Sequence, residues 1–324
     1  MPHDGVVPKS RLALFATAII ALSAFLSDLS AKGAETKRAP YTDLTAKFPQ
    51  FVDSTSGMDE APRVAQFRTQ MDPLLPGFYT PRDGTTPERF DARVARALKE
   101  FPELRPRYEQ VQRDFPKAFE AGIQHFRKAL PGFKPNVPVY LLHSLGEMDG
   151  GIRQLGGKNY LIFGADVLAR MHDSHTLTPF LDHELFHVEH AKQFPECAQV
   201  WCALWAEGLA TYAAKVMNPG ADDRQLLLTS PAPIRAAVDA SWPKAACFTR
   251  AKLESEDEVN TLFTGGPEGG EFPRRFGYYV GLRVAEELGA EHSLAQLTGM
   301  PPERAKLVLA EGINRLITKA GGCL

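Results

Sequence analysis

Residues 183–187 read His-Glu-Leu-Phe-His, a pattern whose residue types and spacing can hold a metal ion. In a helix, His183 and His187 lie one turn apart on one face, so both imidazoles can reach the same ion. Glu184 then lies beside that ion, where a carboxylate can take a proton from water that the metal has made more acidic. Because so short a pattern also arises by chance, it needs two supporting features: a helix that presents this face, and a third ligand.

Glu207 is the predicted third ligand, because a catalytic zinc site usually has three protein ligands and one open position. It follows His187 by twenty positions. That length allows the first helix to end, the chain to turn at residues 194–197, and a second helix to return across the first. Small residues around Glu207 would let the two helices approach closely, namely Ala203, Gly208, Ala210 and Ala214.

The elements that must position these ligands are two predicted helices, at about 178–193 and 198–217. Thr178 followed by Pro179 is a typical helix start. Apolar residues occupy a different face of the first helix from the two histidines, so that this helix can be buried while the histidine face opens onto a cleft. These apolar residues are Leu181, Leu185 and Val188.

The rest of the chain predicts an α+β fold that is predominantly helical, with a small antiparallel sheet beside the ligand helices. Apolar residues recur at helical spacing over 86–101 and 105–130, although Pro116 is expected to kink or divide the second stretch. Residues 137–145 read as a strand, and 152–164 as two extended segments around Gly156 and Gly157. Two further helices are predicted over 272–289 and 301–320.

The predicted organisation has four parts. Lys9 and Arg11 precede an apolar run at 12–26 that is too short to span a bilayer comfortably, which is typical of a secretory signal peptide. An uncleaved N-terminal anchor is the alternative. We assign the parts as follows: 1–33 signal peptide, 34–58 linker or loosely ordered segment, 59–135 N-terminal helical region, and 136–324 catalytic region with C-terminal helices.

Composition and cysteine content agree with an exported globular protein, either periplasmic or secreted. With 44% hydrophobic and 23% charged residues and a formal charge of −2, the chain gives no electrostatic reason to expect a nucleic-acid or anionic-membrane partner. In an oxidising compartment its four cysteines form an even disulfide set with three possible connectivities. These cysteines are Cys197, Cys202, Cys247 and Cys323.

Over residues 137–290 the chain resembles the gluzincin metallopeptidases, the thermolysin-like clan, through the His-Glu-x-x-His pattern and Glu207 in AEGLATY. The resemblance implies one zinc ion per chain on His183, His187 and Glu207, with Glu184 as the general base in peptide-bond hydrolysis. It also implies that a strand before the first helix lines the substrate cleft, for which residues 159–166 are the counterpart.

A Tyr-x-x-Gly motif at Tyr278 to Gly281 repeats one found in aminopeptidase-like gluzincins. By this resemblance, Tyr278 would donate a hydrogen bond to the oxyanion that develops on the scissile carbonyl, with Tyr279 as the competing candidate. The chain also departs from the clan, because Thr211 stands where thermolysin-like enzymes have Asp. Metzincins would need His at 193, where this chain has Gln193.

Three functions agree with this pattern: a zinc peptidase acting on peptides or proteins, a zinc hydrolase for another amide or ester, and a catalytically silent binding protein. The first is our interpretation, since a silent descendant would not need Glu184. The sequence does not distinguish endo- from exopeptidase action, and it does not predict an oligomeric state.

Overall fold

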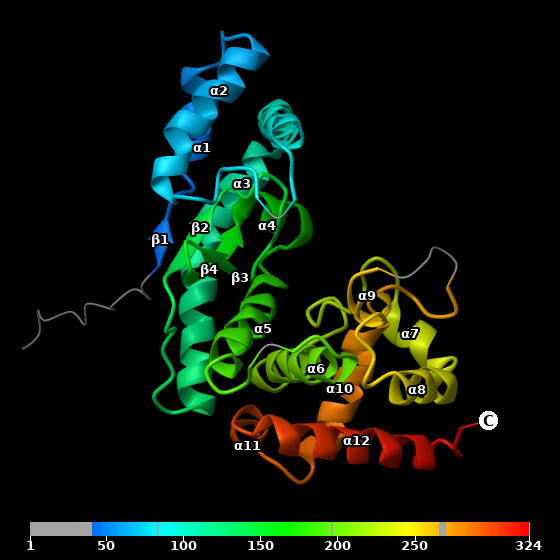
Figure 1. The fold of residues 1–324 in the computed structure, drawn as a ribbon. Coiled ribbons are helices and arrows are strands. Elements are labelled where there is room, and N and C mark those ends of the chain that lie inside the picture. The colour runs from blue at the N-terminus through cyan, green and yellow to red at the C-terminus, as the bar shows by residue number, and fades with distance from the viewer. Residues whose placement is uncertain (1–40, 83, 196, 266–269, 324) are drawn as a thin grey trace, which may run out of the picture. The chain divides into compact units, whose positions relative to one another are not determined.

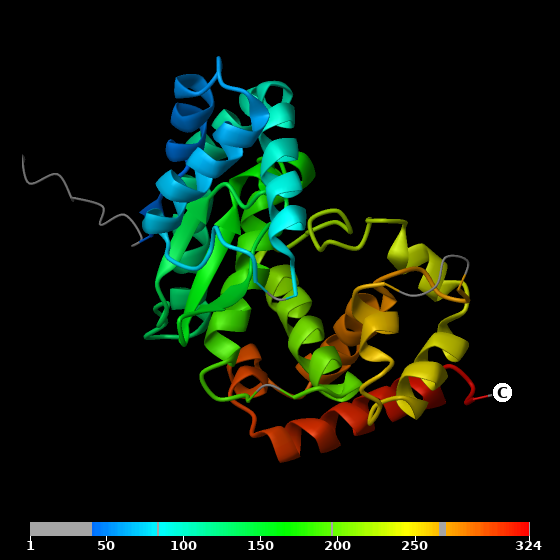
Figure 2. The same ribbon diagram turned by 45° about the horizontal axis from the view of Figure 1, so that its top comes forward.

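Helices make up most of the described chain, and a small four-stranded sheet lies among them (Figures 1 and 2). The computed structural model describes residues 41–323, apart from 83, 196 and 266–269. The predicted fold class, α+β and predominantly helical, is confirmed. The predicted signal peptide at 1–33 and the first part of the predicted linker lie outside the described residues.

The sheet is mixed, whereas the sequence predicted an antiparallel one. Its strands are β1 (Thr42–Asp43), β2 (Val139–Leu142), β3 (Ile152–Leu155) and β4 (Lys158–Gly164), in the order β1-β2-β4-β3. The β3–β4 hairpin is antiparallel, but β2 pairs in parallel with both β1 and β4. The connection at 143–151 is long enough for β3 to skip one strand position, so β4 enters between β2 and β3 and runs alongside β2.

Residues 41–58, predicted as part of a linker, contribute β1 and the helix α1 (Lys47–Ser54). Phe48, Phe51 and Val52 all point to one face of α1 and are buried. The Phe48 ring stacks on the buried imidazole of His143 at a centroid distance of 3.5 Å. The segment therefore belongs to the core. It is followed by α2 (Glu60–Met71) and the short 3₁₀ helix η1 (Asp72–Leu74).

A single helix, α3 (Pro87–Ala129), replaces the two predicted stretches and is not divided at Pro116. The Thr86 hydroxyl caps its first turn by accepting a hydrogen bond from the backbone N–H of Arg89. Each internal proline removes a backbone hydrogen bond. A buried aromatic stripe along the helix offsets this loss. The helix is not straight, since its first and last turns run in different directions in Figures 1 and 2. The stripe includes Phe101, Tyr108, Phe115, Phe119 and Phe126.

The two predicted ligand helices are α5 (Leu177–His190) and α6 (Val200–Met217), preceded by α4 (Ala165–Met171). Helix α5 packs between α3 and α6. It approaches α3 closely at Gly122, where a Cβ atom would lie 3.1 Å from a methyl carbon of Leu185. Because α3 packs on α4 and α5, the predicted regions 59–135 and 136–324 share one unit.

Six helices complete the chain: α7 (Ile234–Asp239), α8 (Trp242–Ala251), α9 (Val259–Phe263), α10 (Phe276–Gly289), α11 (Leu294–Thr298) and α12 (Pro302–Lys319). Helix α10 crosses α6, and α12 packs against α10 and α8 (Figure 1). The α6–α10 crossing is very close, since a Cβ atom on Gly208 would lie 2.6 Å from the carbonyl carbon of Gly281. Within the described residues, no helix is both long and apolar enough to cross a membrane.

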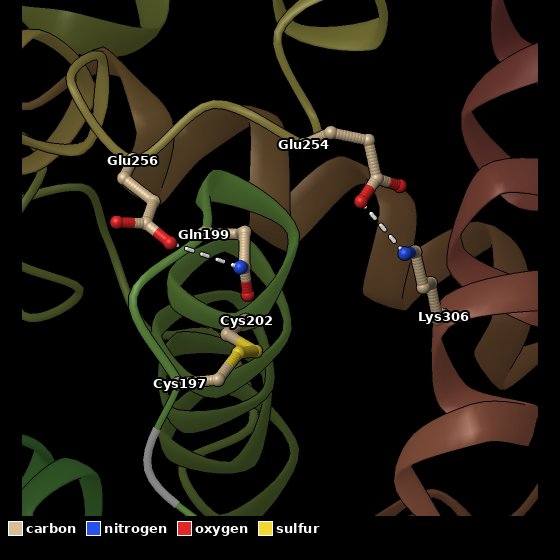
Figure 3. Close-up of a disulfide and its surroundings, with 6 residues drawn as sticks. All are labelled: Cys197, Gln199, Cys202, Glu254, Glu256 and Lys306. Atoms are coloured by element: carbon tan, nitrogen blue, oxygen red, sulfur yellow. Dashed lines mark hydrogen bonds and ion pairs between the residues drawn. A yellow bond between two sulfur atoms is a disulfide. The ribbon is translucent and has the colours of Figure 1, made fainter.

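The disulfides join Cys197 to Cys202 and Cys247 to Cys323, with Cα–Cα distances of 6.0 Å and 5.8 Å. The first closes the turn that leads into α6 (Figure 3). The second ties α8 to the end of the chain.

Backbone hydrogen bonds also hold the start of α6, because Val200 N–H donates to the Ser255 carbonyl and Trp201 N–H to the Leu253 carbonyl, both at 2.9 Å. The side chain of Gln199 donates to Glu256 at 3.1 Å beside them (Figure 3). The helix that carries Glu207 is therefore anchored at its first turn.

Candidate metal centre

The side chains of His183, His187 and Glu207 converge on one point. Nε2 of His183 lies 3.2 Å from Nε2 of His187 and 3.2 Å from a carboxylate oxygen of Glu207, and that oxygen lies 3.5 Å from Nε2 of His187. Ligands about 2.0–2.1 Å from zinc at tetrahedral angles are separated by roughly 3.3 Å. The donor types and their spacing are therefore compatible with a single bound metal ion. These three residues form the group that could hold a metal ion among the described residues.

The helix crossings bring these ligands together. His183 and His187 lie one turn apart on α5, as predicted, and α6 crosses α5 with Glu207 facing them. Gly208, the next residue after Glu207, is the point of closest approach to Gly281 on α10. Since Gly281 lies one turn after Tyr278, a single close crossing sets the positions of both Glu207 and the tyrosine.

The ligands line a cavity of about 360 Å³ that also contains residues from three other parts of the chain. One wall comes from the connection between β2 and β3, a second from the loop after α6, and a third from the start of α10. The additional lining residues are Asp149, Gly150, Gly151, Ile152, Phe180, Glu184, Leu227, Arg275 and Tyr278.

Glu184, the predicted general base, lies in this cavity and is 9% exposed. Burial is the main reason that the pKa of its carboxyl is raised to about 8; the charge of His187 opposes this rise, and the charges of Asp149 and Glu207 add to it. The Glu184 side chain fits in this space because Gly150 and Gly151 beside it have no Cβ atom. A Cβ atom on Gly150 would lie 3.0 Å from Cγ of Glu184 and 2.8 Å from the ring of Phe180.

His187 and Glu207 form the strongly charged pair of the site. Burial alone would raise the pKa of Glu207, but the charge of His187 and its hydrogen bonds with both histidines outweigh burial and hold this pKa well below its usual range. The carboxylate is therefore ionised, as a metal ligand must be. Burial lowers the pKa of His183, and the positive charge of His187 adds to that effect.

Of the two candidate tyrosines, Tyr278 lines the cavity and Tyr279 does not. The Tyr278 ring lies 6.1 Å from that of His183, and burial raises the pKa of its hydroxyl. Tyr279 points to the other side of α10, where its hydroxyl donates a hydrogen bond of 2.8 Å to Asp239.

The strand expected to line the cleft, residues 159–166, is in the wrong place for that role. These residues form most of β4, which is paired on both sides by β2 and β3. The cavity is lined instead by residues 149–152, which lead into the edge strand β3. The prediction named the β3–β4 hairpin correctly but chose β4, whereas the residues that line the cavity lead into β3. The sequence could not distinguish the two strands, because the order of strands in the sheet depends on long-range pairing.

His190 takes no part in the cavity, although it follows His187 by one turn. It is buried, and its ring lies between those of Phe186 and Phe194 at centroid distances of 5.3 Å and 4.5 Å. Asp182, next to His183, also faces away from the site. Its carboxylate lies 2.8 Å from Nδ1 of His125 on α3 and accepts a bond of 2.7 Å from Asn218 at the end of α6. Asp182 thus locks α5 to both neighbouring helices.

Four features of the cavity wall were not predicted from the sequence: Asp149, the Gly150–Gly151 pair, Leu227 and Arg275. Leu227 and Arg275 have φ values of +61° and +67°, a left-handed conformation that is uncommon for residues with a side chain and that clusters at functional sites. The paired glycines just before an extended segment were the one local signal. Asp149 directly precedes these glycines, whereas Leu227 and Arg275 lie far from the motif in sequence.

Neither family models, nor curated proteins, nor solved structures gave a match to this chain.

Proposed function

We propose that the protein is a zinc-dependent peptidase of the gluzincin type, with one zinc ion per chain held by His183, His187 and Glu207. The observation that carries the proposal is the set of donor distances, 3.2, 3.2 and 3.5 Å, in a cavity that also holds Glu184. A zinc ion bound there would supply Lewis acidity, which polarises a substrate carbonyl and makes water more acidic.

Glu184 is the group that moves protons in this proposal. Its carboxylate accepts a proton from the attacking water as the water oxygen bonds to the carbonyl carbon. It then passes that proton to the amine nitrogen as the carbon–nitrogen bond breaks. Burial raises the pKa of this carboxyl, which makes its ionised form a stronger proton acceptor in the first step.

Tyr278 is the proposed hydrogen-bond donor to the carbonyl oxygen as negative charge develops on it. Its hydroxyl keeps its proton at neutral pH because burial raises its pKa. A donor of this kind contributes about 3 kcal/mol of transition-state stabilisation.

The edge strand β3 supports a peptide as the substrate. Within the described residues, β3 pairs with β4 alone and forms an edge of the sheet, and residues 149–152 at its start line the cavity. An extended chain can add to such an edge through backbone hydrogen bonds. We also propose that the protein is exported, to the periplasm or the outside of the cell, because both disulfides require an oxidising compartment.

The test compares the wild type with Glu184→Gln, each assayed for bound zinc and for cleavage of a diverse peptide library. We expect about one zinc ion per chain in both proteins and cleavage only in the wild type, because glutamine cannot accept the proton. A Glu184→Gln variant with near-normal kcat would show that the assigned base is wrong. A zinc-loaded wild type that cleaves esters or other amides but no peptide would favour the broader zinc-hydrolase alternative.

A further inference from the structure

The charges that line the metal cavity are distributed unevenly. Three carboxylates lie in its wall, namely Asp149, Glu184 and Glu207. Among the described residues that line the cavity, Arg275 is the only lysine or arginine. Apart from the proposed zinc site, Arg275 is therefore the described part of the cavity wall that would attract a negatively charged group of a substrate.

Two contacts, neither of them with a carboxylate, hold Arg275 in the cavity wall. Its guanidinium carbon lies 4.5 Å from the centre of the Tyr278 ring, over the ring face, and its Nη1 donates to the Ser230 carbonyl at 3.4 Å. Within the described part of the chain, no carboxylate lies within ion-pair distance of this guanidinium. Arg153, the other arginine near Glu184, differs in this respect because it pairs with Glu147 at 3.3 Å.

The backbone at Arg275 is consistent with a functional rather than a packing role. Its φ of +67° is a conformation that costs a residue with a side chain of order 1 kcal/mol or more, and glycine would adopt it freely. The residue is also the N-cap of α10, so its side chain leaves the helix just before the turn that carries Tyr278. Stacking on the tyrosine restricts the guanidinium while leaving N–H groups at its edge to donate.

From these contacts we infer that Arg275 forms an anion subsite that binds a carboxylate of the substrate close to the scissile bond. The inference rests on the proposed peptidase function and adds a substrate class to it: peptides with either an acidic side chain or the C-terminal carboxylate next to the bond that is cleaved. Arginine suits this role because its planar fork of donors matches the two oxygens of a carboxylate.

The matched control is already in the chain. Arg274 is the preceding residue, carries the same charge, is exposed and does not line the cavity. Arg274→Gln and Arg275→Gln therefore change the net charge equally, and only the second removes a donor from the cavity.

The experiment uses matched peptides that contain Glu or Gln beside the cleaved bond, each with a free or an amidated C-terminus. Cleavage is measured with the zinc-loaded wild type and both arginine variants. Binding of the same peptides is measured by calorimetry in the Glu184→Gln background, which requires no turnover. We expect the wild type and Arg274→Gln to favour the carboxylate-bearing peptide about tenfold or more, mainly through KM, and Arg275→Gln to lose that preference.

The peptide pairs also identify the source of the carboxylate. A preference for Glu over Gln that survives amidation assigns the subsite to an acidic side chain. A preference that disappears on amidation, whichever side chain is present, assigns it to the C-terminus.

Two results would overturn the inference: equal binding of acid and amide peptides by the wild type, or unchanged discrimination in Arg275→Gln. In the second case, a fall in kcat on all peptides alike would mean that Arg275 only positions Tyr278. If no peptide is cleaved but Arg275 still determines binding, the subsite stands and the peptidase proposal fails. If peptides are cleaved without any preference for a carboxylate, the peptidase proposal stands and the anion subsite fails.

Discussion

The close crossing of α6 and α10 predicts that Gly208→Ala damages both stability and the metal site. A Cβ atom at this position would lie 2.6 Å from the carbonyl carbon and 2.7 Å from Cα of Gly281. Carbon atoms pack best at about 3.5–4.0 Å, so the two backbones must separate by about 1 Å. Neither backbone can yield as a flexible side chain would.

The expected loss of stability follows from two opposing effects. Overpacking in a rigid interior costs about 1–3 kcal/mol, whereas replacing glycine by alanine in a helix returns up to about 1 kcal/mol. With the full gain from alanine subtracted, we expect a net loss of up to about 2 kcal/mol in the free energy of unfolding.

The functional effect should exceed the loss of stability. Glu207 precedes Gly208, and Tyr278 lies one turn before Gly281, so separating the helices moves a ligand and the proposed oxyanion donor together. A displacement of 1 Å can reduce catalysis about a hundredfold. We therefore expect weaker zinc binding and a large fall in kcat even at temperatures where the variant is fully folded.

Denaturant unfolding measures the first effect, and competition with a chromogenic zinc chelator measures the second. Gly57→Ala is the control, because nothing lies within 4 Å of a Cβ atom there and the backbone conformation is ordinary. A Gly208→Ala protein that is at least as stable as the wild type and binds zinc equally well would refute the reasoning.

Three other variants test separate parts of the site and core. Glu207→Ala should lower bound zinc well below one ion per chain, measured by elemental mass spectrometry, and abolish the rise in melting temperature on adding zinc, measured by thermal scans. Full zinc occupancy in this variant would exclude Glu207 as a ligand. Tyr278→Phe should lower kcat about a hundredfold with zinc content unchanged, whereas Tyr279→Phe should not, and equal effects of the two would remove Tyr278 from the mechanism. Burial lowers the pKa of His143 to about 4, so between about pH 6.5 and 4 this residue binds a proton in the unfolded chain but not in the folded one. The free energy of unfolding should therefore fall by up to roughly 3 kcal/mol as the pH is lowered through this range. His143→Leu should be less stable at pH 7 but lose this part of the pH dependence in denaturant unfolding, and an unchanged slope would contradict the assignment.

Local spacing was enough to predict the part of the site that lies within single helices. His183 and His187 share a face because a helix repeats every 3.6 residues, and Glu207 could be assigned because one turn and one helix suffice to bring it back. The long helices were predicted within a few residues of their bounds, since their apolar stripes are strong. The exception was α3, where two stretches were predicted and Pro116 was expected to kink or divide the second, whereas one continuous helix covers Pro87–Ala129.

The missed helix α1 shows the limit of composition as a guide. Prolines and polar residues at 34–58 suggested a linker, yet three apolar residues on one face were sufficient for a helix once a surface existed to bury them. That surface includes His143, which lies far along the chain. The sequence of the segment could not show its partner.

Local patterns in the chain were therefore enough to predict the helical framework, the histidine pair on one helix, and Glu207 within reach of that pair. Tertiary packing selects the tyrosine that faces these side chains, because consecutive residues on a helix point about 100° apart and the Gly208–Gly281 crossing turns one of them toward the cavity. It also decided the mixed sheet, the pairing of the cysteines and the place of Arg275 in the cavity wall. The physical reason is common to all four: helices form from contacts between near neighbours, whereas strand order, disulfide pairing and cavity lining depend on contacts between residues distant in sequence.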